Sequence, residues 1–232
     1  MPKGNTENNV KKTGRMEKIN DWIRSKREDF QNQPLGINDL GNDPIDQFNQ
    51  WLQEAKDADV LDPLAVNLST VNSVGMPSSR VLYLRDIIDG KFVYYTNYQS
   101  QKSVESAANN QVCLNFHWKE LQRQVKINGV VERTDPEVSD AYFASRPRAS
   151  QIGAWSSDQS HQLTTEDALA NRVAEMTKKF ENHEVIPRPE HWGGWQVVPT
   201  LIEFWQGRPS RLHDRIVFTY NGGEWHKIRL NP

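Results

Sequence analysis

The sequence predicts a mainly β protein with peripheral α-helices, arranged as a closed or partly closed antiparallel barrel. About seven stretches of strand-forming residues follow one another between short turn signals. Three or four helical patterns interrupt them, without the strict strand–helix alternation that a parallel doubly wound sheet requires. Residues 1–42 are interpreted as an N-terminal arm, and residues 43–232 as the folded domain.

The arm opens with residues 1–17, a stretch rich in Asn, Lys, Gly, Thr and Glu. This composition is typical of segments that stay disordered unless they dock. A short helix is expected near residues 18–30, because Ile19, Trp22 and Ile23 share one helical face. Proline and glycine residues then break the chain before the domain begins.

The first helix of the domain is expected to begin at Asp43-Pro44. Asp43 suits the N-cap and Pro44 the first helical position. Apolar residues then recur at three- and four-residue steps and predict one buried stripe: Ile45, Phe48, Trp51, Leu52 and Ala55.

The remaining elements alternate irregularly along the chain. Strands are expected at residues 65–71, 81–84, 92–96, 112–118, 124–131, 195–205, 215–220 and 225–230. Helices are expected near 103–109, from Pro136 to Ser145, and from Thr164 through Phe180. Glycine-containing turns such as Asp89-Gly90 separate the strands.

Charge and composition narrow the functional classes. Twenty-eight basic and 30 acidic residues leave a formal charge of −2, which argues against a strongly basic nucleic-acid binder. The sequence has neither an apolar run long enough to span a bilayer nor a visible signal peptide, so a cytoplasmic protein is expected. A single cysteine, Cys113, and six scattered histidines predict neither a disulfide nor a metal site.

Three segments concentrate cationic side chains. Residues 145–151 hold two arginines and two serines in a proline-stiffened loop, which suits an anionic group, although a solvated basic loop is the plainer alternative. Residues 208–215 hold three arginines and a histidine. There Arg211 and His213 would share one face of an extended backbone, with Asp214 as a counter-charge.

The third cationic segment, residues 80–85, has an arginine at each end. On a regular strand Arg80 and Arg85 project to opposite faces, as two separate anion contacts or as ordinary exposed strand ends. Because the cations are clustered while the overall charge is near zero, the segments together favour a small phosphorylated ligand over a polymer. Eight Trp and six Tyr residues could supply stacking partners for a planar ring.

Read as strings, these segments carry a family resemblance. The strings are R-V-L-Y-L-R at 80–85, Y-T-N at 95–97, L-Q-R-Q-V at 121–125, Y-F-A-S-R-P-R-A-S-Q-I-G-A-W at 142–155, W-G-G-W at 192–195, E-F-W-Q-G at 203–207 and R-L-H-D-R at 211–215. Over roughly residues 43–232 the chain resembles the pyridoxamine/pyridoxine 5′-phosphate oxidases, which are FMN-dependent enzymes of vitamin B6 metabolism.

The resemblance implies a fold, an assembly and a reaction. The fold is an FMN-binding split antiparallel β-barrel, in a homodimer with FMN at the subunit interface. The reaction oxidises pyridoxamine or pyridoxine 5′-phosphate to pyridoxal 5′-phosphate, with FMN as hydride acceptor and dioxygen as final oxidant, and it yields hydrogen peroxide. From the charge and composition given above, neither a nucleic acid nor a membrane is expected as a partner.

The resemblance also assigns residues. The FMN contacts it implies are Arg80, Val81, Leu82, Tyr83, Leu84, Tyr95, Thr96, Lys102, Gln124, Gln159, Ser160, Trp205 and Arg215. The substrate contacts it implies are Arg85, Tyr142, Arg146, Ser150, Arg211, Leu212 and His213. Arg211 and His213 are the expected catalytic pair, which orients the substrate ring and stabilises developing charge.

Three positions depart from the family pattern. Arg85 stands where a lysine is common, Gln101 replaces an arginine before Lys102, and Phe30 replaces a tyrosine in the arm. These departures leave two alternatives open: a diverged flavin oxidoreductase with another substrate, and a non-enzymatic binding protein for flavin or pyridoxal phosphate. The resemblance gives no role to Trp155 or Trp192, although both lie in its motifs.

Overall fold

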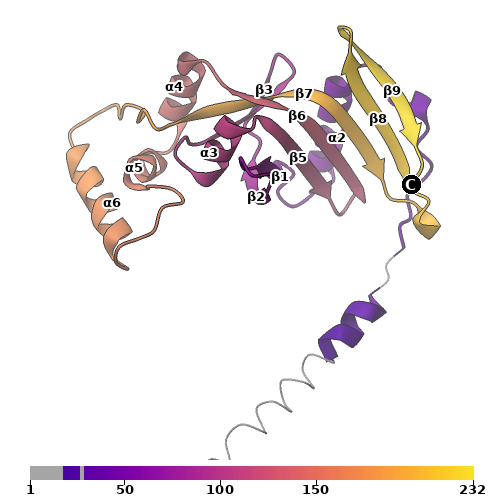
Figure 1. The fold of residues 1–232 in the computed structure, drawn as a ribbon, viewed down its shortest axis with the longest axis horizontal. Coiled ribbons are helices and arrows are strands. Elements are labelled where there is room, and N and C mark those ends of the chain that lie inside the picture. The colour runs from indigo at the N-terminus through magenta and orange to yellow at the C-terminus, as the bar shows by residue number, and fades with distance from the viewer. Residues whose placement is uncertain (1–17, 27–28) are drawn as a thin grey trace, which may run out of the picture.

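The computed structural model describes residues 18–26 and 29–232 (Figure 1). Nine strands in this part of the chain join one antiparallel sheet. They are β1 (Ala65–Val71), β2 (Pro77–Tyr83), β3 (Asp86–Ile88), β4 (Lys91–Asn97), β5 (Gln111–Trp118), β6 (Arg123–Arg133), β7 (Trp192–Gln206), β8 (Asp214–Asn221) and β9 (Glu224–Leu230). Besides a short helix at residues 18–25, the helices are η1 (Ile37–Asp39), α2 (Pro44–Asp57), α3 (Gln101–Ala108), α4 (Pro136–Ser145), α5 (Arg148–Ser156), α6 (Ala168–Lys179) and η2 (Pro209–Arg211).

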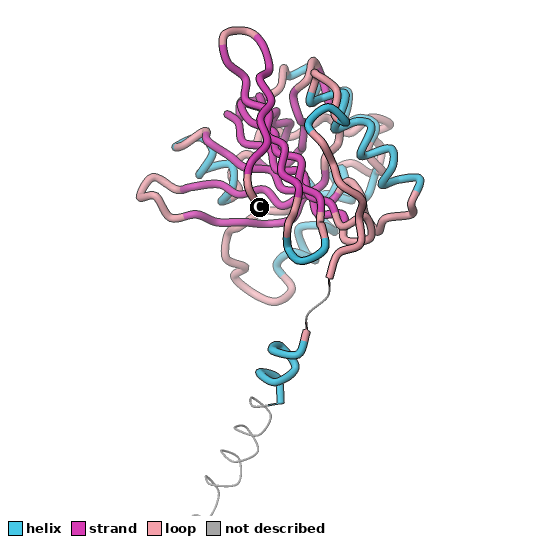
Figure 2. The backbone as a smooth tube through the Cα atoms, turned by 90° about the vertical axis from the view of Figure 1, so that its right-hand side faces the viewer, coloured by secondary structure: helices cyan, strands magenta, loops and turns pink. Residues whose placement is uncertain are grey.

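The 15-residue strand β7 organises the sheet. Along one edge it pairs with β6, and its other edge is shared by β4 over residues 192–197 and β8 over residues 201–206. The main path runs β2-β1-β5-β6-β7-β4-β3, with β9 paired to β8. Figure 2 shows the strands crossing through the centre, with helices at the periphery. Helices α4, α5 and α6 lie at the start of β7, and the β8–β9 hairpin lies toward its end (Figure 1).

The predicted elements are confirmed, apart from their ends. The strand at 65–71 and the helix from Pro136 to Ser145 have the predicted bounds, whereas β2 begins earlier, at Pro77. Strand β3 and helix α5 were not predicted. The helix expected near 18–30 is present at residues 18–25, and its three apolar residues are exposed. The disorder expected for residues 1–17 lies outside the described residues.

Helix α2 packs into the hollow of the sheet. The Asp43 side chain accepts the N–H of Ile45 at 2.7 Å, as expected of an N-cap. Phe48 is fully buried, and its ring lies 5.0 Å from the rings of Phe92 and Phe116. Burying one such side chain contributes about 1.5–3 kcal/mol, so the apolar stripe of α2 ties the helix firmly to the strands.

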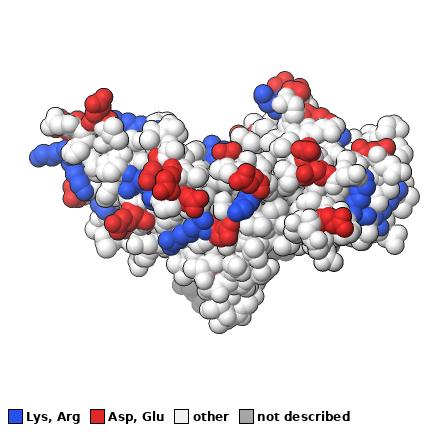
Figure 3. Space-filling view, turned by 90° about the horizontal axis from the view of Figure 1, so that it is seen from above, with Lys and Arg blue, Asp and Glu red and all other residues white. Residues whose placement is uncertain are grey.

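A second apolar cluster joins α4, α5 and the segment after α6 to the start of β7. Its buried members include Phe143, Ile152, Phe180 and Trp192. On the face of the molecule seen in Figure 3, acidic and basic side chains are interspersed rather than gathered by sign. No helix among residues 18–26 and 29–232 has the length and apolar character needed to cross a bilayer.

Candidate functional site

A pocket of about 490 Å³ opens beside β2, β4 and the start of α3. Eight of the predicted FMN contacts line it: Arg80, Val81, Leu82, Tyr95, Thr96, Lys102, Gln159 and Ser160. Ser78, Ser79 and Gln101 also line the pocket and were not predicted as contacts. The two serines directly precede the R-V-L-Y-L-R string, so strand alternation was the signal that could have found them.

Lys102 is the buried cation of this pocket. Its Nζ donates to Thr96 Oγ1 and Ser100 Oγ, each at 3.1 Å, and the residue is only 9% exposed. Burial, with the charge of Arg80 as a second cause, lowers the pKa of Lys102 to about 8. No ion pair among the described residues includes Lys102. An uncompensated ammonium group in the first turn of α3 attracts an anion.

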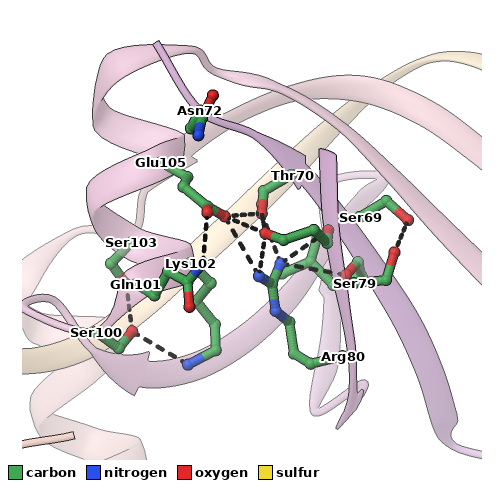
Figure 4. A network of polar contacts seen from close by, with 12 residues as sticks. Ser69, Thr70, Asn72, Ser79, Arg80, Ser100, Gln101, Lys102, Ser103 and Glu105 are labelled. Carbon is green, nitrogen blue, oxygen red and sulfur yellow. Dashed lines mark hydrogen bonds and ion pairs between the residues drawn. The ribbon is translucent and has the colours of Figure 1, made fainter. Parts of the chain in front are cut away.

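Arg80 lines the same pocket, but its guanidinium group donates hydrogen bonds to oxygen atoms of the protein (Figure 4). Its Nη1 donates to Thr70 Oγ1 and its Nη2 to Ser78 Oγ, both at 2.6 Å, and Nη2 lies 3.3 Å from Glu105 Oε2. The guanidinium is therefore fixed in direction and partly neutralised.

Glu105 is the centre of this polar network. Burial alone would raise its pKa, but hydrogen bonds from Ser78, Thr70 and Gln101, together with the charge of Arg80, outweigh burial and lower the pKa to about 2. The Gln101 amide donates to Glu105 Oε1 at 2.9 Å. Gln101 thus binds the carboxylate and adds no cation at the position where the resemblance led us to expect an arginine.

A second cavity, of about 270 Å³, lies beside the first and shares Gln159 with it. Its other lining residues are Asn97, Arg146, Ser150, Gly153, Ala154, Ser157 and Trp192. The predicted loop at 145–151 is wrong in its second half, because α5 begins at Arg148 directly after Pro147. Ser150 therefore projects from a helix.

Arg146 is the partly buried cation of the second cavity. Burial lowers its pKa, and the neighbouring charge of Arg85 lowers it further. Its Nη1 is buried without a hydrogen-bond partner. Tyr142 stacks on Tyr95 with ring centroids 3.8 Å apart, so a predicted substrate contact touches a predicted flavin contact. The structure brings Tyr142, Arg146 and Ser150 to one side of the first pocket.

Four further predicted residues lie outside these two cavities, and two of them, Leu84 and Arg85, line a separate cavity beside α2. Gln124 lines an adjacent cavity that shares Val81 with the first pocket. Arg85 is exposed and lies over the Tyr83 ring at 4.9 Å, whereas Leu84 is buried.

The remaining predicted residues gather at the far end of β7. The rings of Trp205 and His213 are 4.6 Å apart, and the Arg208 backbone N–H donates to His213 Nδ1 at 3.1 Å. Burial and the charge of Arg211 lower the pKa of His213, against the opposite effect of Asp214 and Asp29. A neutral imidazole whose Nδ1 accepts a hydrogen bond carries its proton on Nε2.

The extended backbone expected around Arg211 is wrong. Ser210 and Arg211 adopt left-handed φ angles of 58° and 63° in the turn η2, so Arg211 and His213 do not alternate along a strand. The Ser210 N–H donates to Asp29 Oδ1 at 3.0 Å. Two adjacent non-glycine residues in this region are strained, and such strain is concentrated at functional sites.

The charged side chains around η2 differ in whether they are paired with an opposite charge. Asp214 is a counter-charge, as expected, but its partners are Arg208 and Arg229. Arg215 Nε donates to the buried Glu203 at 2.7 Å, which raises the pKa of Arg215. Leu212 and Arg211 are exposed. Within one chain, β7 separates this group from the two cavities, because Trp192 and Trp205 lie near its opposite ends (Figure 1).

Comparison with known families supplies the deciding observation. A family model described as pyridoxamine 5′-phosphate oxidase matches residues 52–180. A second, described as the pyridoxine 5′-phosphate oxidase C-terminal dimerisation region, matches residues 192–232. The chain belongs to the pyridoxine/pyridoxamine 5′-phosphate oxidase family. Membership confirms the expected enzyme class and implies a flavin cofactor.

Curated relatives agree along most of the chain. The pyridoxine/pyridoxamine 5′-phosphate oxidase of Thermosynechococcus vestitus is 47% identical over 210 residues, which is 90% of this chain and 99% of the relative. The Cupriavidus necator protein of the same name is 47% identical over 199 residues, covering 85% and 93%.

Solved structures confirm the split-barrel fold. PhzG from Burkholderia lata, in complex with tetrahydrophenazine-1-carboxylic acid, has a TM-score of 0.80 at 28% identity, covering 86% of this chain and 98% of that one. An FMN-binding protein from Nostoc punctiforme, related to pyridoxamine 5′-phosphate oxidase, has a TM-score of 0.65 at 14% identity, covering 83% and 100%. The second likeness concerns the fold alone.

Proposed function

We propose that this protein oxidises pyridoxine 5′-phosphate and pyridoxamine 5′-phosphate to pyridoxal 5′-phosphate, with FMN as hydride acceptor and dioxygen as final oxidant. The observation that carries the proposal is the pair of adjacent cavities that share Gln159. Each contains a cation that is at least partly buried and joins no ion pair among the described residues, Lys102 in one and Arg146 in the other. Cofactor and substrate each carry one phosphate, so two neighbouring anion sites match the pair.

The first pocket has the donors that an FMN phosphate requires. Lys102 supplies a charge that the protein leaves uncompensated, and Arg80 supplies a guanidinium held in place by Glu105. Thr96 and Ser160 add hydroxyl groups on the pocket wall. FMN held by these residues would supply a hydride acceptor for the substrate C4′ carbon, and dioxygen would take up the two electrons and two protons as hydrogen peroxide. Pyridoxine 5′-phosphate would give the aldehyde directly, whereas pyridoxamine 5′-phosphate would give an imine that water hydrolyses to the aldehyde and ammonia.

The second cavity has the donors for the substrate phosphate. Arg146 and Ser150 line it, and Tyr142 adjoins it. Arg85 lines a separate cavity, but its positive charge lies near enough to lower the pKa of Arg146. A phosphate dianion relieves the repulsion between the two arginines, so it is favoured over an unphosphorylated vitamer. Arg85 keeps the charge of the lysine that the family commonly has.

We also propose that the enzyme is a homodimer, with FMN between two copies of the chain. The dimer brings the group formed by Trp205, Arg211, Leu212, His213 and Arg215 of one copy to the two cavities of the other. Arg211 would orient the pyridine ring, and the His213 Nε2–H would donate a hydrogen bond to it. A cytoplasmic location stays a prediction of the sequence.

The test is an anaerobic single turnover. Pyridoxine 5′-phosphate added to the FMN-loaded protein should bleach the flavin absorbance, and air should restore it while pyridoxal 5′-phosphate and peroxide appear. Unphosphorylated pyridoxine and a phenazine precursor should bleach it far more slowly. A protein that is colourless and cannot be reconstituted with FMN, or that reacts as readily with the two comparison compounds, would contradict the proposal.

Arg211 provides the matching mutational test. Arg211→Ala removes a substrate-orienting group, so turnover should fall by about a hundredfold. FMN content should stay near that of the wild type, because the first pocket does not include Arg211. Turnover by initial rates and flavin content by absorbance are measured on the same preparation. An equal loss of both would refute this role for Arg211.

A further inference from the structure

The W-G-G-W segment places Trp192 at the first position of β7, paired with Asn97 of β4. The two glycines that follow admit no side chain: a Cβ on Gly193 would lie 2.1 Å from Tyr98 Oη, and one on Gly194 would lie 2.5 Å from Thr134 Oγ1. The start of β7 is therefore pressed against neighbouring side chains, and Trp192 is only 7% exposed.

The Trp192 indole belongs to a set of three nearly parallel rings. Its plane is within 9° of Tyr95 and within 7° of Tyr142, at centroid distances of 5.7 Å and 6.3 Å. Phe143 packs on it edge-on at 5.2 Å. A ring held by this many aromatic neighbours has little freedom to move, so it forms a rigid wall of the second cavity.

The Arg146 guanidinium lies over this wall. Its central carbon is 4.5 Å from the Trp192 ring and 5.6 Å from the Phe143 ring. Arg146 has no carboxylate partner among the described residues, and its Nη1 has no hydrogen-bond partner. A cation over an indole face is attracted by the ring quadrupole, and the attraction leaves the N–H donors unused.

We propose that Trp192 is the positioning residue for Arg146: its ring face holds the guanidinium in the second cavity so that the N–H donors face the substrate phosphate. The inference rests on the proposed function, because it takes the phosphate as the anion that Arg146 binds. A carboxylate in the same place would fix the side chain equally well, but it would compete with the phosphate for the donors. An aromatic face fixes it without that competition.

The experiment is a double-mutant cycle on the FMN-loaded enzyme with pyridoxine 5′-phosphate. Trp192→Leu keeps an apolar side chain but removes the ring face, so KM should rise about tenfold while kcat changes less than about twofold. The Kd for FMN, from fluorescence titration, should be unchanged. In an Arg146→Ala background the same change should add almost nothing to KM, because the group that Trp192 positions is gone.

Trp155 offers the matched control. It packs against the same apolar cluster and carries a cation over its ring, Lys179 at 4.6 Å, but it does not line the cavity. Trp155→Leu should leave KM within about twofold of the wild type. If Trp192→Leu does not fold, Trp192→Phe, which keeps a smaller ring, should raise KM about threefold under the same cycle.

The outcomes separate the two proposals. If Arg146→Ala raises KM strongly but the Trp192 effect adds to it in full, Trp192 is only structural and the positioning role fails. An equal rise of KM in the Trp155 control would also refute it. If Arg146→Ala leaves KM unchanged, or the wild type does not oxidise the substrate, the proposed function itself fails.

Discussion

Lys102 and Arg80 lie in one pocket but differ in their electrostatic state. Arg80 is hydrogen-bonded to Thr70 and Ser78 and paired with Glu105, whereas the Lys102 amine donates hydrogen bonds to two hydroxyl groups. Burying an ammonium group without a carboxylate costs stability. We infer that the buried charge of Lys102 destabilises the flavin-free protein, and that a bound phosphate removes this destabilisation by compensating the charge.

Lys102→Met should therefore have opposite effects on folding and on binding. In the flavin-free protein the folded pKa of Lys102, about 8, lies below the ordinary lysine pKa of 10.5, so the unfolded state binds more protons between these pH values. Wild-type stability should then rise with pH across that window. At pH 7 the uncharged variant should be more stable by about 1–3 kcal/mol, a gain that vanishes near pH 10.5. Thermal denaturation at several pH values checks this.

Flavin affinity should change in the other direction. Lys102→Met should weaken FMN binding at least about tenfold, and wild-type affinity should decline as the pH rises above about 8, because only the protonated amine binds phosphate strongly. Lys91→Met is the control, since the Lys91 amine is partly exposed and paired with Glu132. It should leave both quantities nearly unchanged. A Lys102 variant less stable than the wild type at pH 7 would contradict the inference that the buried ammonium group destabilises the flavin-free protein.

The cations themselves were predictable from the sequence, but their partners were not. Glu105 is 25 residues from Arg80, and Glu203 is 12 residues from Arg215, so only the folded sheet shows which arginines are neutralised. Gln101 illustrates the limit. From the sequence we could note only that a cation expected there is missing, whereas the structure shows that the Gln101 amide donates a hydrogen bond to Glu105.

At the scale of elements, the pairing of β6 with β7 brings the two backbones very close together at one point. The register between them shifts at Asn128–Gly129, leaving Thr200 of β7 without a partner in β6. A Cβ at Gly129 would lie 2.2 Å from the Val198 carbonyl oxygen. Because that oxygen belongs to the backbone of the central strand, no side-chain movement can make room.

Gly129→Ala should accordingly destabilise the fold by about 3 kcal/mol or more, since β6 and β7 must separate locally. Gly153→Ala is its counterpart: Gly153 lies in helix α5, with open space where the Cβ would go. That substitution should stabilise by up to about 1 kcal/mol, the helix-propensity difference between the two residues. Urea denaturation of both variants provides the measurement. Equal midpoints would contradict the packing argument.

Periodicity predicted the long elements and missed the short ones for physical reasons. Helix α2 has a continuous apolar stripe and a proline start, so its pattern is unambiguous. Helix α5 follows Pro147 and begins with Arg-Ala-Ser-Gln, which has the composition of a polar loop. Strand β3 has three residues, too few for any period. The left-handed turn at Ser210 and Arg211 contains no glycine, so nothing in the sequence signals positive φ angles there.

The whole molecule is too elongated to assemble the proposed active site alone. Strand β7 carries Trp192 at its first residue and Trp205 near its last, and an extended 15-residue strand spans up to roughly 46 Å. Arg146 lies over Trp192 at one end, whereas Arg211 follows the other end. In the homodimer that we propose, a two-fold axis would bring opposite ends of two chains together and give two equivalent sites.

A complementation experiment tests that arrangement. Arg146→Ala damages the cavity of its own chain, and Arg211→Ala damages the group that its chain gives to the other copy. Each variant alone should be nearly inactive at low substrate concentration, because every site in its homodimer carries the damage. In a mixed dimer both substitutions fall in the same site and the second site is intact.

With random pairing, half of the dimers are mixed, so about a quarter of wild-type activity should return. Co-expression with two affinity tags isolates the mixed dimer, which should have about half of wild-type activity with the KM of the wild type. An inactive mixed dimer that still binds FMN would show that Arg146 and Arg211 act from the same chain, and the shared site would have to be abandoned.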